Sequence, residues 1–471
     1  MADRISVRVR MYRRGLGDRF LLTFTEQDRT CHMLIDCGTL KGTENADQVM
    51  REVVSDIRDA TNKKLDVLVI THEHWDHISG FSPPTSTIWD DIDVGEVWMA
   101  WTENPNSPEA EGLRTAREAT IADLKKISLL PGQKQVLGPG VDALLLFSNE
   151  ELEDDNRSIT RDAMLYAGSK AKGNVQFLDP GTFVKLPNIA GARAYVLGPP
   201  KSKELFKDRP SASGGEAYLA GAPPTLADSF FAASAAGLTD REDRDDPRTF
   251  PFAEDYQITP GEAQNRAFFR KYYFGDSPGQ STAWRKIDDD WLGVANELAL
   301  ALDSDTNNTS LALAIELAGS RHVLLFPGDA QVGSWLTWHS YATWRAHAHD
   351  EPDREATAED LLGRTIFYKV GHHGSHNATL RARGLELMGE QGLVAMIPVD
   401  EQLAKKLRWK MPYEPLLNRL IEKTRGRVIR GDTGLPTREQ AQALTDVEWQ
   451  RFRAATVESD NLLYIDYTIT A

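Results

Sequence analysis

The sequence has little cysteine and no long hydrophobic run, and each scarcity excludes a class of protein. It contains two cysteines, Cys31 and Cys37, in 471 residues, too few for the disulfide framework of a small secreted domain. Its longest apolar runs are strand-sized, well short of the roughly 20 residues that a membrane span needs. Near the start, Ile5 and Val7 alternate with polar residues, which predicts a strand and not an apolar signal core. We therefore expect a reduced, cytoplasmic protein that makes no contact with a membrane.

Basic residues are in deficit. The 54 Lys and Arg residues face 70 Asp and Glu residues, which gives a net charge of −16 and argues against a protein that coats nucleic acid through a broad basic surface. A locally basic cleft remains compatible with this charge. The candidate is the segment Lys405–Arg430, where Trp409 and Tyr413 offer rings on which bases stack. The competing interpretation, which we favour, is a solvated amphipathic helix whose apolar side chains pack inward.

Histidine is scarce but concentrated. Three of the 11 histidines lie with an aspartate in the six residues His72-Glu73-His74-Trp75-Asp76-His77. The cluster follows an apolar run, Leu65–Ile70, that reads as a buried strand. In an extended segment His72 and His74 project to the same side, so two imidazoles can share one metal ion. A turn can then bring Asp76 and His77 close by.

These donor types select among metals. Imidazole plus carboxylate is a ligand set for zinc, iron(II) or manganese, and the nitrogen donors favour zinc. The spacing differs from the helical zinc-protease motif, because position 76 holds Asp where that motif requires a second His. The alternative, histidines clustered by chance or capping a helix, explains the strand-end position less well.

The rest of the chain alternates strand and helix patterns. We expect strands at 5–12, 20–25, 31–36, 65–70, 94–100, 183–186, 194–197, 311–317, 322–326, 366–370, 393–399 and 462–468, and helices at 47–60, 107–128 and 332–346. Residues 201–304, rich in Pro, Gly, Ser, Ala and Asp over their first part, read as an insertion or lid. The pattern alone predicts an α/β protein with mixed sheets.

The His72–His77 cluster resembles the HxHxDH signature of the metallo-β-lactamase superfamily. Three further segments resemble motifs of the superfamily and occur in the same order as in the superfamily. Met33–Gly38 precedes the cluster, and Gly328-Asp329 and Lys369–Ser375 follow it. The resemblance implies a four-layer αββα sandwich of two mixed β-sheets with a long insertion. It further implies one domain over 1–471, with an N-terminal half at 1–173, a C-terminal half at 174–200 and 305–471, and the insertion at 201–304.

A narrower resemblance is to the ComEC/Rec2-type hydrolase branch. It rests on Gly15-Leu16-Gly17-Asp18, Asn307-Asn308-Thr309-Ser310-Leu311 and His372-His373-Gly374-Ser375. In that branch the hydrolase domain is attached to, or related to, a DNA-uptake channel protein. Because this chain has no membrane-length segment, it would be a free-standing relative.

The superfamily resemblance implies a ligand set with one gap. His72 and His74 would hold a first metal; Asp76, His77 and His372 would hold a second; and Asp329 would bridge them. The first metal usually takes a third histidine, but no histidine occurs from Ile78 to Arg321. Asn307 or Asn308, near Ser310, could fill the gap with an amide oxygen or a held water. We therefore expect one or two Zn²⁺ ions, with Mn²⁺ possible because the first seat is short of an imidazole.

Other residues near these motifs are candidates for supporting roles. We expect Asp36 to orient a ligand or the loop. His373 or His376 would act as general acid to the leaving group, or alternatively anchor the ligands. Asp76 is counted among the catalytic residues as well as the ligands.

Together these features predict a metal-dependent hydrolase that uses a metal-activated water. Because of the ComEC/Rec2-type resemblance, a phosphodiester is the expected substrate, which makes the protein a nuclease or a nucleotide phosphodiesterase. One alternative is hydrolysis of a small ester, lactone or amide. Another is a metal-binding regulatory protein with weak or no activity. The expected partner is a hydrolysable small molecule or a nucleic acid, and the sequence leaves the oligomeric state open.

Overall fold

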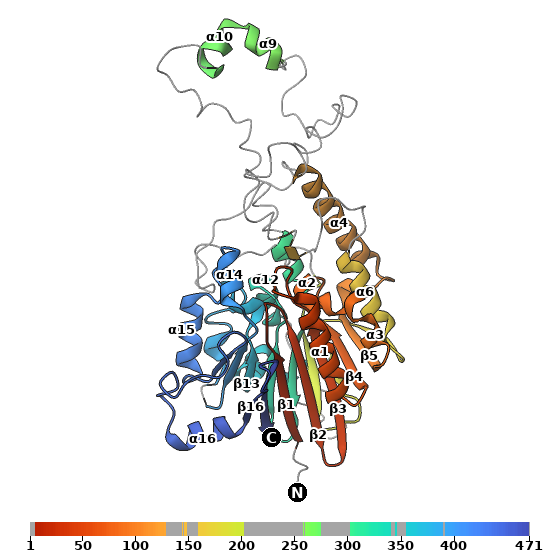
Figure 1. The fold of residues 1–471 in the computed structure, drawn as a ribbon, viewed down its shortest axis with the longest axis vertical. Coiled ribbons are helices and arrows are strands. Elements are labelled where there is room, and N and C mark those ends of the chain that lie inside the picture. The colour runs from red at the N-terminus through yellow and green to blue at the C-terminus, as the bar shows by residue number, and fades with distance from the viewer. Residues whose placement is uncertain are drawn as a thin grey trace.

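Two mixed β-sheets face each other in the computed structural model, which describes residues 5–128, 144, 146–147, 159–201, 258, 260–274, 302–340, 344–345, 355–389 and 391–470 (Figure 1). The first sheet has the order β16-β17-β1-β2-β3-β4-β5-β6. Its strands are β1 (Ile5–Tyr12), β2 (Arg19–Glu26), β3 (Arg29–Cys37), β4 (Lys64–Ile70), β5 (Asp93–Ala100), β6 (Val175–Leu178), β16 (Thr456–Glu458) and β17 (Tyr464–Thr470). Strands β3 to β6 pair in parallel and the others antiparallel.

The second sheet has the order β15-β14-β13-β10-β9-β8-β7. Its strands are β7 (Phe183–Lys185), β8 (Ala192–Gly198), β9 (Ala312–Leu317), β10 (His322–Phe326), β13 (Thr365–Lys369), β14 (Val394–Ile397) and β15 (Val428–Arg430). Strands β10, β13, β14 and β15 are parallel. A separate pair is formed by β11 (Trp344–Arg345) and β12 (Glu355–Ala356).

Helices cover the outer face of each sheet. On the first sheet, α1 (Ala46–Ala60), α3 (Ser86–Trp89) and α6 (Ile159–Ser169) bury apolar residues such as Val53, Trp89 and Met164. On the second, α12 (Val332–Trp338), α13 (Ala358–Gly363) and α15 (Glu414–Lys423) bury residues such as Trp335. Other helices of the described residues include α2 (Trp75–Ile78), α4 (Pro108–Ser128), α9 (Pro260–Asn265), α10 (Ala267–Phe269), α14 (Glu401–Lys406) and α16 (Asp446–Ala454).

The inner faces of both sheets form the central core. Alternate residues of β1 and β2, such as Val9 and Leu22, pack with Leu313 and Phe326 of the second sheet, as the period-two pattern of their strands requires. With helices outside both sheets, the order of layers is αββα. The predicted α/β four-layer sandwich of two mixed sheets is confirmed.

The division of the chain at residue 174 does not coincide with the division into two sheets. Strand β6 begins at Val175 but pairs with β5 in the first sheet. Strand β17, near the C-terminus, also returns to the first sheet and pairs with β1 along its whole length. The first sheet therefore contains strands from both halves of the resemblance-based division, whereas the strands of the second sheet all lie in the C-terminal half.

One predicted helix is too long. The pattern over 332–346 predicts a single helix, but α12 ends at Trp338, and Trp344 and Arg345 form β11. The spacing of Trp335, Trp338 and later aromatic residues imitates helical periodicity past the helix end. Both tryptophans are fully buried and stack on each other with centroids 4.1 Å apart.

The basic segment Lys405–Arg430 packs as the favoured interpretation predicts. Instead of one helix it forms α14 and α15, separated by Arg408 at a φ of 62° and by Pro412. Leu416 and Leu420 of α15 are buried in the outer core of the second sheet. The inward-packing amphipathic face is thus confirmed for α15.

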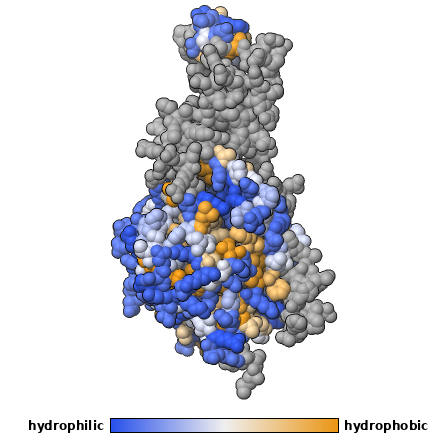
Figure 2. Space-filling model, turned by 90° about the vertical axis from the view of Figure 1, so that its right-hand side faces the viewer, coloured by the Kyte–Doolittle hydropathy of each residue, from blue (hydrophilic) through white to orange (hydrophobic). Residues whose placement is uncertain are grey.

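The insertion 201–304 lies mostly outside the described residues, which include only 201, 258, 260–274 and 302–304 of it. Its α10 and the following turn expose Phe268, Tyr272 and Tyr273. Figure 2 shows one face of the molecule, on which the described residues are largely hydrophilic with hydrophobic residues interspersed. Within the described residues, no helix combines the length and the apolar character that crossing a membrane requires.

Candidate metal centre

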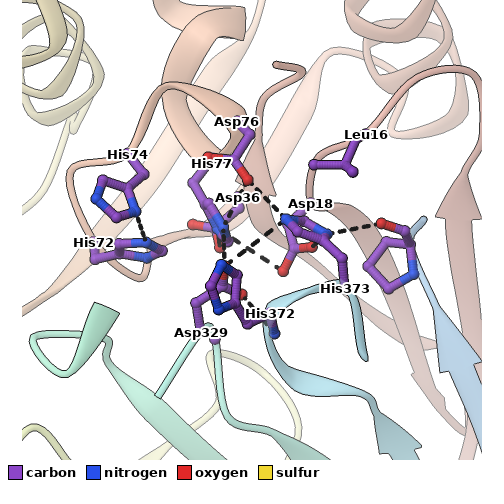
Figure 3. Close-up of polar contacts among 12 residues, drawn as sticks. Leu16, Asp18, Asp36, His72, His74, Asp76, His77, Asp329, His372 and His373 are labelled. Carbon is purple, nitrogen blue, oxygen red and sulfur yellow. Dashed lines mark hydrogen bonds and ion pairs between the residues drawn. The ribbon is translucent and has the colours of Figure 1, made fainter. Parts of the chain in front are cut away.

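The predicted motifs meet at one edge of the sandwich because parallel strands end on the same side (Figure 3). The loop after β4 carries His72 to His77, the loop after β10 carries Asp329, and the loop after β13 carries His372 and His373. The backbone N–H of Leu311 donates to the carbonyl of Thr71 over 2.8 Å, which joins the second sheet to the first at this point. Residues some 250 to 300 positions apart are thereby brought into contact.

His72 and His74 form the first part of the centre. The Nε2 atom of His72 lies 3.0 Å from Nδ1 of His74. The Thr71 hydroxyl donates to Asp36, so it can only accept from Nδ1 of His72, 3.1 Å away. That bond leaves the lone pair of His72 on Nε2, where it faces His74. Burial lowers the pKa of both histidines, that of His74 to about 3. Both rings are therefore neutral and have a lone pair available for a metal.

Asp76, His77, Asp329 and His373 form the second part. Nε2 of His373 lies 2.7 Å from Oδ2 of Asp76, and Nε2 of His77 lies 3.1 Å from Oδ2 of Asp329. All four residues are at most 1 % exposed. The second part adjoins the first, since the rings of His72 and His77 have centroids 4.1 Å apart. Ligand atoms of Asp18, His77, Asp329 and His373 all lie within 4.8 Å of one another.

Neighbouring groups fix both imidazoles of the second part. Nδ1 of His77 is 2.7 Å from Oδ2 of Asp36, and Nδ1 of His373 is 2.8 Å from the carbonyl oxygen of Pro398. Each acceptor holds the proton on Nδ1 and turns Nε2 toward the centre. Burial alone would lower the pKa of His77, but the carboxylates around it, Asp329 first, raise it well above its usual value. Asp36 thus contacts the centre through His77, as an orienting residue does.

Several buried atoms of the centre lack a hydrogen-bond partner among the described residues. They include Oδ1 of Asp76, Nε2 of His77 and Oδ2 of Asp329. Unpaired buried carboxylate oxygens are costly and are normally paired or bound to a metal. Their nitrogen and oxygen types match a divalent transition metal. The residues present therefore fit a metal centre.

A buried lysine holds one oxygen of Asp329. Nζ of Lys369, the last residue of β13, lies 3.1 Å from Oδ1 of Asp329 and donates to the carbonyl of Gly328 over 2.8 Å. It also pairs with Oδ2 of Asp18. Burial would lower the pKa of Lys369, but Asp18 and Asp329 raise it, so it stays charged. The pairing leaves Oδ2 of Asp329 directed at His77.

Asp18 was identified in the sequence only as part of a motif, without a role. The Gly15–Asp18 turn packs directly on the His72–His77 segment, which we call the metal loop. The N–H of Asp18 donates to the carbonyl of Asp76 over 2.9 Å. The N–H of Gly38 in turn donates to the carbonyl of Asp18 over 3.1 Å. The Gly-x-Gly-Asp pattern was therefore the available signal for a residue at this centre.

Of the residues proposed as substitute ligands or supports of the first seat, only Ser310 has a contact with His72 among those described here. Oδ1 of Asn308 accepts from the N–H groups of Gln331 and Ser334, over 3.0 and 3.2 Å, at the start of α12. Nδ2 of Asn307 donates to Asp303 over 3.2 Å. Oγ of Ser310 lies 3.2 Å from Nδ1 of His72 and accepts from the N–H of Asp329. Ser310 thus connects the two parts of the centre.

His372 contacts Asp329 of the centre, whereas the ring contact of His376 is with Tyr413. The N–H of His372 donates to Oδ1 of Asp329 over 3.0 Å, and its Nδ1 lies 3.3 Å from Nε2 of Gln331. Burial lowers its pKa to about 4. The contact with Asp76, which the resemblance implies for His372, is made by His373. His376 packs against Tyr413, with ring centroids 6.0 Å apart, and its predicted catalytic role stays a prediction.

Sequence reasoning missed Asp303. Its Oδ1 lies 3.8 Å from Nε2 of His74, on the ring edge opposite the nitrogen that faces His72. The carboxylate is largely buried, with 14 % of its side chain exposed. Burial, together with the charges of Asp76 and Asp329, raises its pKa to about 8. The acidic Asp303-Ser304-Asp305 just before the Asn307 motif was the only sequence signal for it.

An aromatic stack adjoins the first part of the centre. The Phe147 ring stacks on His74 with centroids 5.1 Å apart and on Trp409 with centroids 5.0 Å apart, the latter at an interplanar angle of 8°. Phe147 is 3 % exposed and packs with Leu16 and Leu403. Trp409 of the basic segment is thus one ring away from a candidate ligand.

Comparison with known families agrees with this geometry. The family model described as the metallo-beta-lactamase superfamily matches residues 22–103. The match includes Asp36 and the whole His72–His77 cluster but ends before Asp329 and His373. No curated protein matches the chain. The match supports the superfamily, and the buried Asp and His cluster fits the metal binding that the superfamily implies.

Proposed function

We propose that this protein is a metal-dependent hydrolase of the metallo-β-lactamase superfamily that cleaves phosphodiesters. The observation that carries the proposal is the pair of adjoining buried clusters, His72 with His74 and His77 with His373, Asp76 and Asp329. Carboxylate and imidazole atoms in them have no other partner among the described residues. A single structural cation site would not need two such clusters side by side.

The side chains have separable tasks in this proposal. His72 and His74 would hold a first metal through Nε2 and Nδ1, and Asp76, His77 and His373 would hold a second. Oδ2 of Asp329, which Lys369 leaves unpaired, would lie between them. Divalent metals in such sites supply a nucleophile at neutral pH and neutralise charge on substrate oxygens. Asp36, Thr71 and the Pro398 carbonyl keep the imidazoles in ligand geometry.

The surroundings favour a substrate with a planar ring and a phosphate. Trp409 is only partly buried and ends a stack that runs through the buried Phe147 to His74 of the first seat. Lys406, Arg408 and Lys410 are exposed next to Trp409, so cations lie where a nucleotide backbone would pass. The resemblance to the ComEC/Rec2-type branch supports the same class. This combination favours a nuclease or nucleotide phosphodiesterase over an esterase or a lactonase.

The metal proposed is zinc at the second seat, with zinc or manganese at the first. Two imidazoles and two carboxylates give the second seat the donors that zinc prefers. The first seat has two imidazoles and is short of a third, which makes it the weaker site and more tolerant of Mn²⁺.

Hydrolysis by the purified full chain tests the proposal. After loading with Zn²⁺ or Mn²⁺, the protein is assayed on single-stranded DNA, RNA, a cyclic dinucleotide, bis(p-nitrophenyl) phosphate and a lactone. We expect metal-dependent phosphodiester cleavage, and a loss of about a thousandfold or more in kcat/KM for Asp76→Ala, because the second seat loses a charged ligand.

Asp460→Ala, which removes an exposed carboxylate elsewhere on the chain, serves as the matched control and should keep full activity. Circular dichroism and melting temperature establish that both variants fold. Cleavage that survives Asp76→Ala would contradict the proposed centre. Turnover of the lactone without any phosphodiester cleavage would contradict the proposed substrate class.

A further inference from the structure

The adjacent histidines of the β13 loop are held by different kinds of partner. Nδ1 of His373 lies 2.8 Å from the carbonyl oxygen of Pro398. A carbonyl can only accept, so Nδ1 of His373 carries the proton and Nε2 carries the lone pair in the neutral ring. That lone pair faces Asp76, 2.7 Å away, and Asp329, 3.8 Å away.

His372 has an amide partner instead. Its Nδ1 lies 3.3 Å from Nε2 of Gln331. Oε1 of Gln331 accepts from Nδ2 of Asn377 over 2.8 Å and from the hydroxyl of Ser304, so in this arrangement the Gln331 amide N–H₂ group faces His372. An amide nitrogen only donates, so Nδ1 of His372 accepts and its proton lies on Nε2.

The backbone makes this difference between neighbouring residues possible. His372 and His373 both adopt left-handed conformations, with φ of 43° and 51°, and their ring planes are inclined at 63° with centroids 5.9 Å apart. The N–H of His372 remains tied to Oδ1 of Asp329 over 3.0 Å, which keeps the residue beside the centre. Its Nε2 is buried and has no hydrogen-bond partner among the described residues.

We propose that His372 is not a metal ligand but a neutral hydrogen-bond donor whose Nε2–H contacts a phosphoryl oxygen of the substrate, while His373 takes the ligand position. This rests on the proposed function for the identity of the oxygen. A preorganised neutral donor in a buried site stabilises charge that develops in the transition state without a proton transfer. The unpartnered Nε2–H would then be satisfied only when substrate is bound.

Metal content of the full chain separates the two histidines without any substrate. We expect His372→Ala to retain the metal stoichiometry of the unaltered protein by mass spectrometry, and His373→Ala to lose the metal of the second seat or bind it about 10 to 100 times more weakly. His32→Gln, a change on β3, is the control for loss of a histidine. Metal loss in His372→Ala with retention in His373→Ala would overturn the assignment.

The tautomer of His372 is measured directly by ¹⁵N NMR of the imidazole in the metal-loaded protein. The proposal requires a protonated Nε2 and an unprotonated Nδ1 in His372. Gln331→Glu replaces the amide by a carboxylate, which can only accept, and should move the proton to Nδ1. Gln331→Met removes the partner with little change in volume and shows the effect of losing it alone. A His372 protonated on Nδ1 in the unaltered protein would overturn the proposal.

Steady-state kinetics test whether His372 acts as the hydrogen-bond donor to the substrate. We expect His372→Ala to lower kcat on a phosphodiester by about 10²–10³-fold with a smaller change in KM, as for loss of one oxyanion donor. His372→Gln, whose amide can still donate, should recover part of the loss, whereas Gln331→Glu should lower kcat with full metal content. An unchanged kcat in His372→Ala would overturn the donor role. If the unaltered protein cleaves no phosphodiester, the proposed function fails, while metal content and tautomer still decide the roles of the histidines.

Discussion

The carboxylates around the candidate centre differ in what holds them. The ammonium group of Lys369 pairs with the carboxylates of Asp18 and Asp329. The carboxylate of Asp36 pairs with Nδ1 of His77. Among the described residues no lysine or arginine pairs with Asp303, and burial together with Asp76 and Asp329 raises its pKa to about 8. A bound cation would favour its charged form, so the residue couples metal binding to proton release.

Asp303 is expected to support the first metal through His74. A carboxylate facing the second nitrogen of a ligating imidazole orients the ring and raises its basicity. We predict that Asp303→Asn weakens metal binding at the first seat about 10- to 100-fold and leaves the second seat filled. Competition titration with a chromophoric chelator measures both affinities.

The control for Asp303→Asn is Asp460→Asn, which makes the same change in an exposed carboxylate. It should leave both affinities within about twofold. Equal affinities in Asp303→Asn and the unaltered protein would refute the coupling to His74.

At the scale of elements, short loops hold the centre, and glycines let them approach. A Cβ on Gly38 would lie 2.4 Å from the carbonyl carbon of Asp76 and from the nitrogen of His77. Glu73 fastens the same loop to the neighbouring helices, because it pairs with Arg117 of α4 and accepts from Thr160 of α6 over 3.1 Å. The metal loop is thus fixed from both sides.

Gly38→Ala should therefore disturb the metal loop. We predict a loss of about 2–4 kcal/mol in the free energy of unfolding, because the backbone of the loop must move, together with weaker metal binding. Gly112→Ala in α4 is the control, since nothing lies within 4 Å of its Cβ. The free energy of unfolding of Gly112→Ala should rise by about 0.5–1 kcal/mol, because alanine is more favourable than glycine inside a helix. Chemical denaturation and metal titration measure both, and normal metal affinity in Gly38→Ala would contradict the tight packing.

The sequence predicts the parts of this site that depend on local pattern. His72 to His77 are recognisable because a buried strand directly precedes them, and the layers follow from strand and helix periodicity. Asp303 and Lys369 are not recognisable as partners, because their roles depend on which loops the fold brings together. The extent of α12 was misjudged for a related reason: aromatic spacing continues while the backbone leaves the helix after Trp338.

At the scale of the molecule, the centre connects the two sheets. Asp76 and His77 follow β4 of the first sheet, whereas Asp329 and His373 follow strands of the second. Strand β17 brings the C-terminal residues back to β1 within the first sheet, where Arg10 donates to Asp466 over 2.8 and 2.9 Å. The sheets are therefore held together at the metal edge by charge and elsewhere by the shared core.

Removal of metal should weaken the connection between the two sheets at the metal centre. A ligand that binds only the folded state stabilises it by about 2.7 kcal/mol at a free concentration 100 times its Kd. Without metal, the carboxylates of Asp76 and Asp329 also lose their compensating charge. We predict that a chelator lowers the melting temperature measured by calorimetry and that re-addition of Zn²⁺ restores it. Asp329→Ala should melt at the lower temperature with or without chelator, whereas Asp460→Ala should keep the full response. A chelator response that persists in Asp329→Ala would mean that the metal joining the sheets is bound elsewhere.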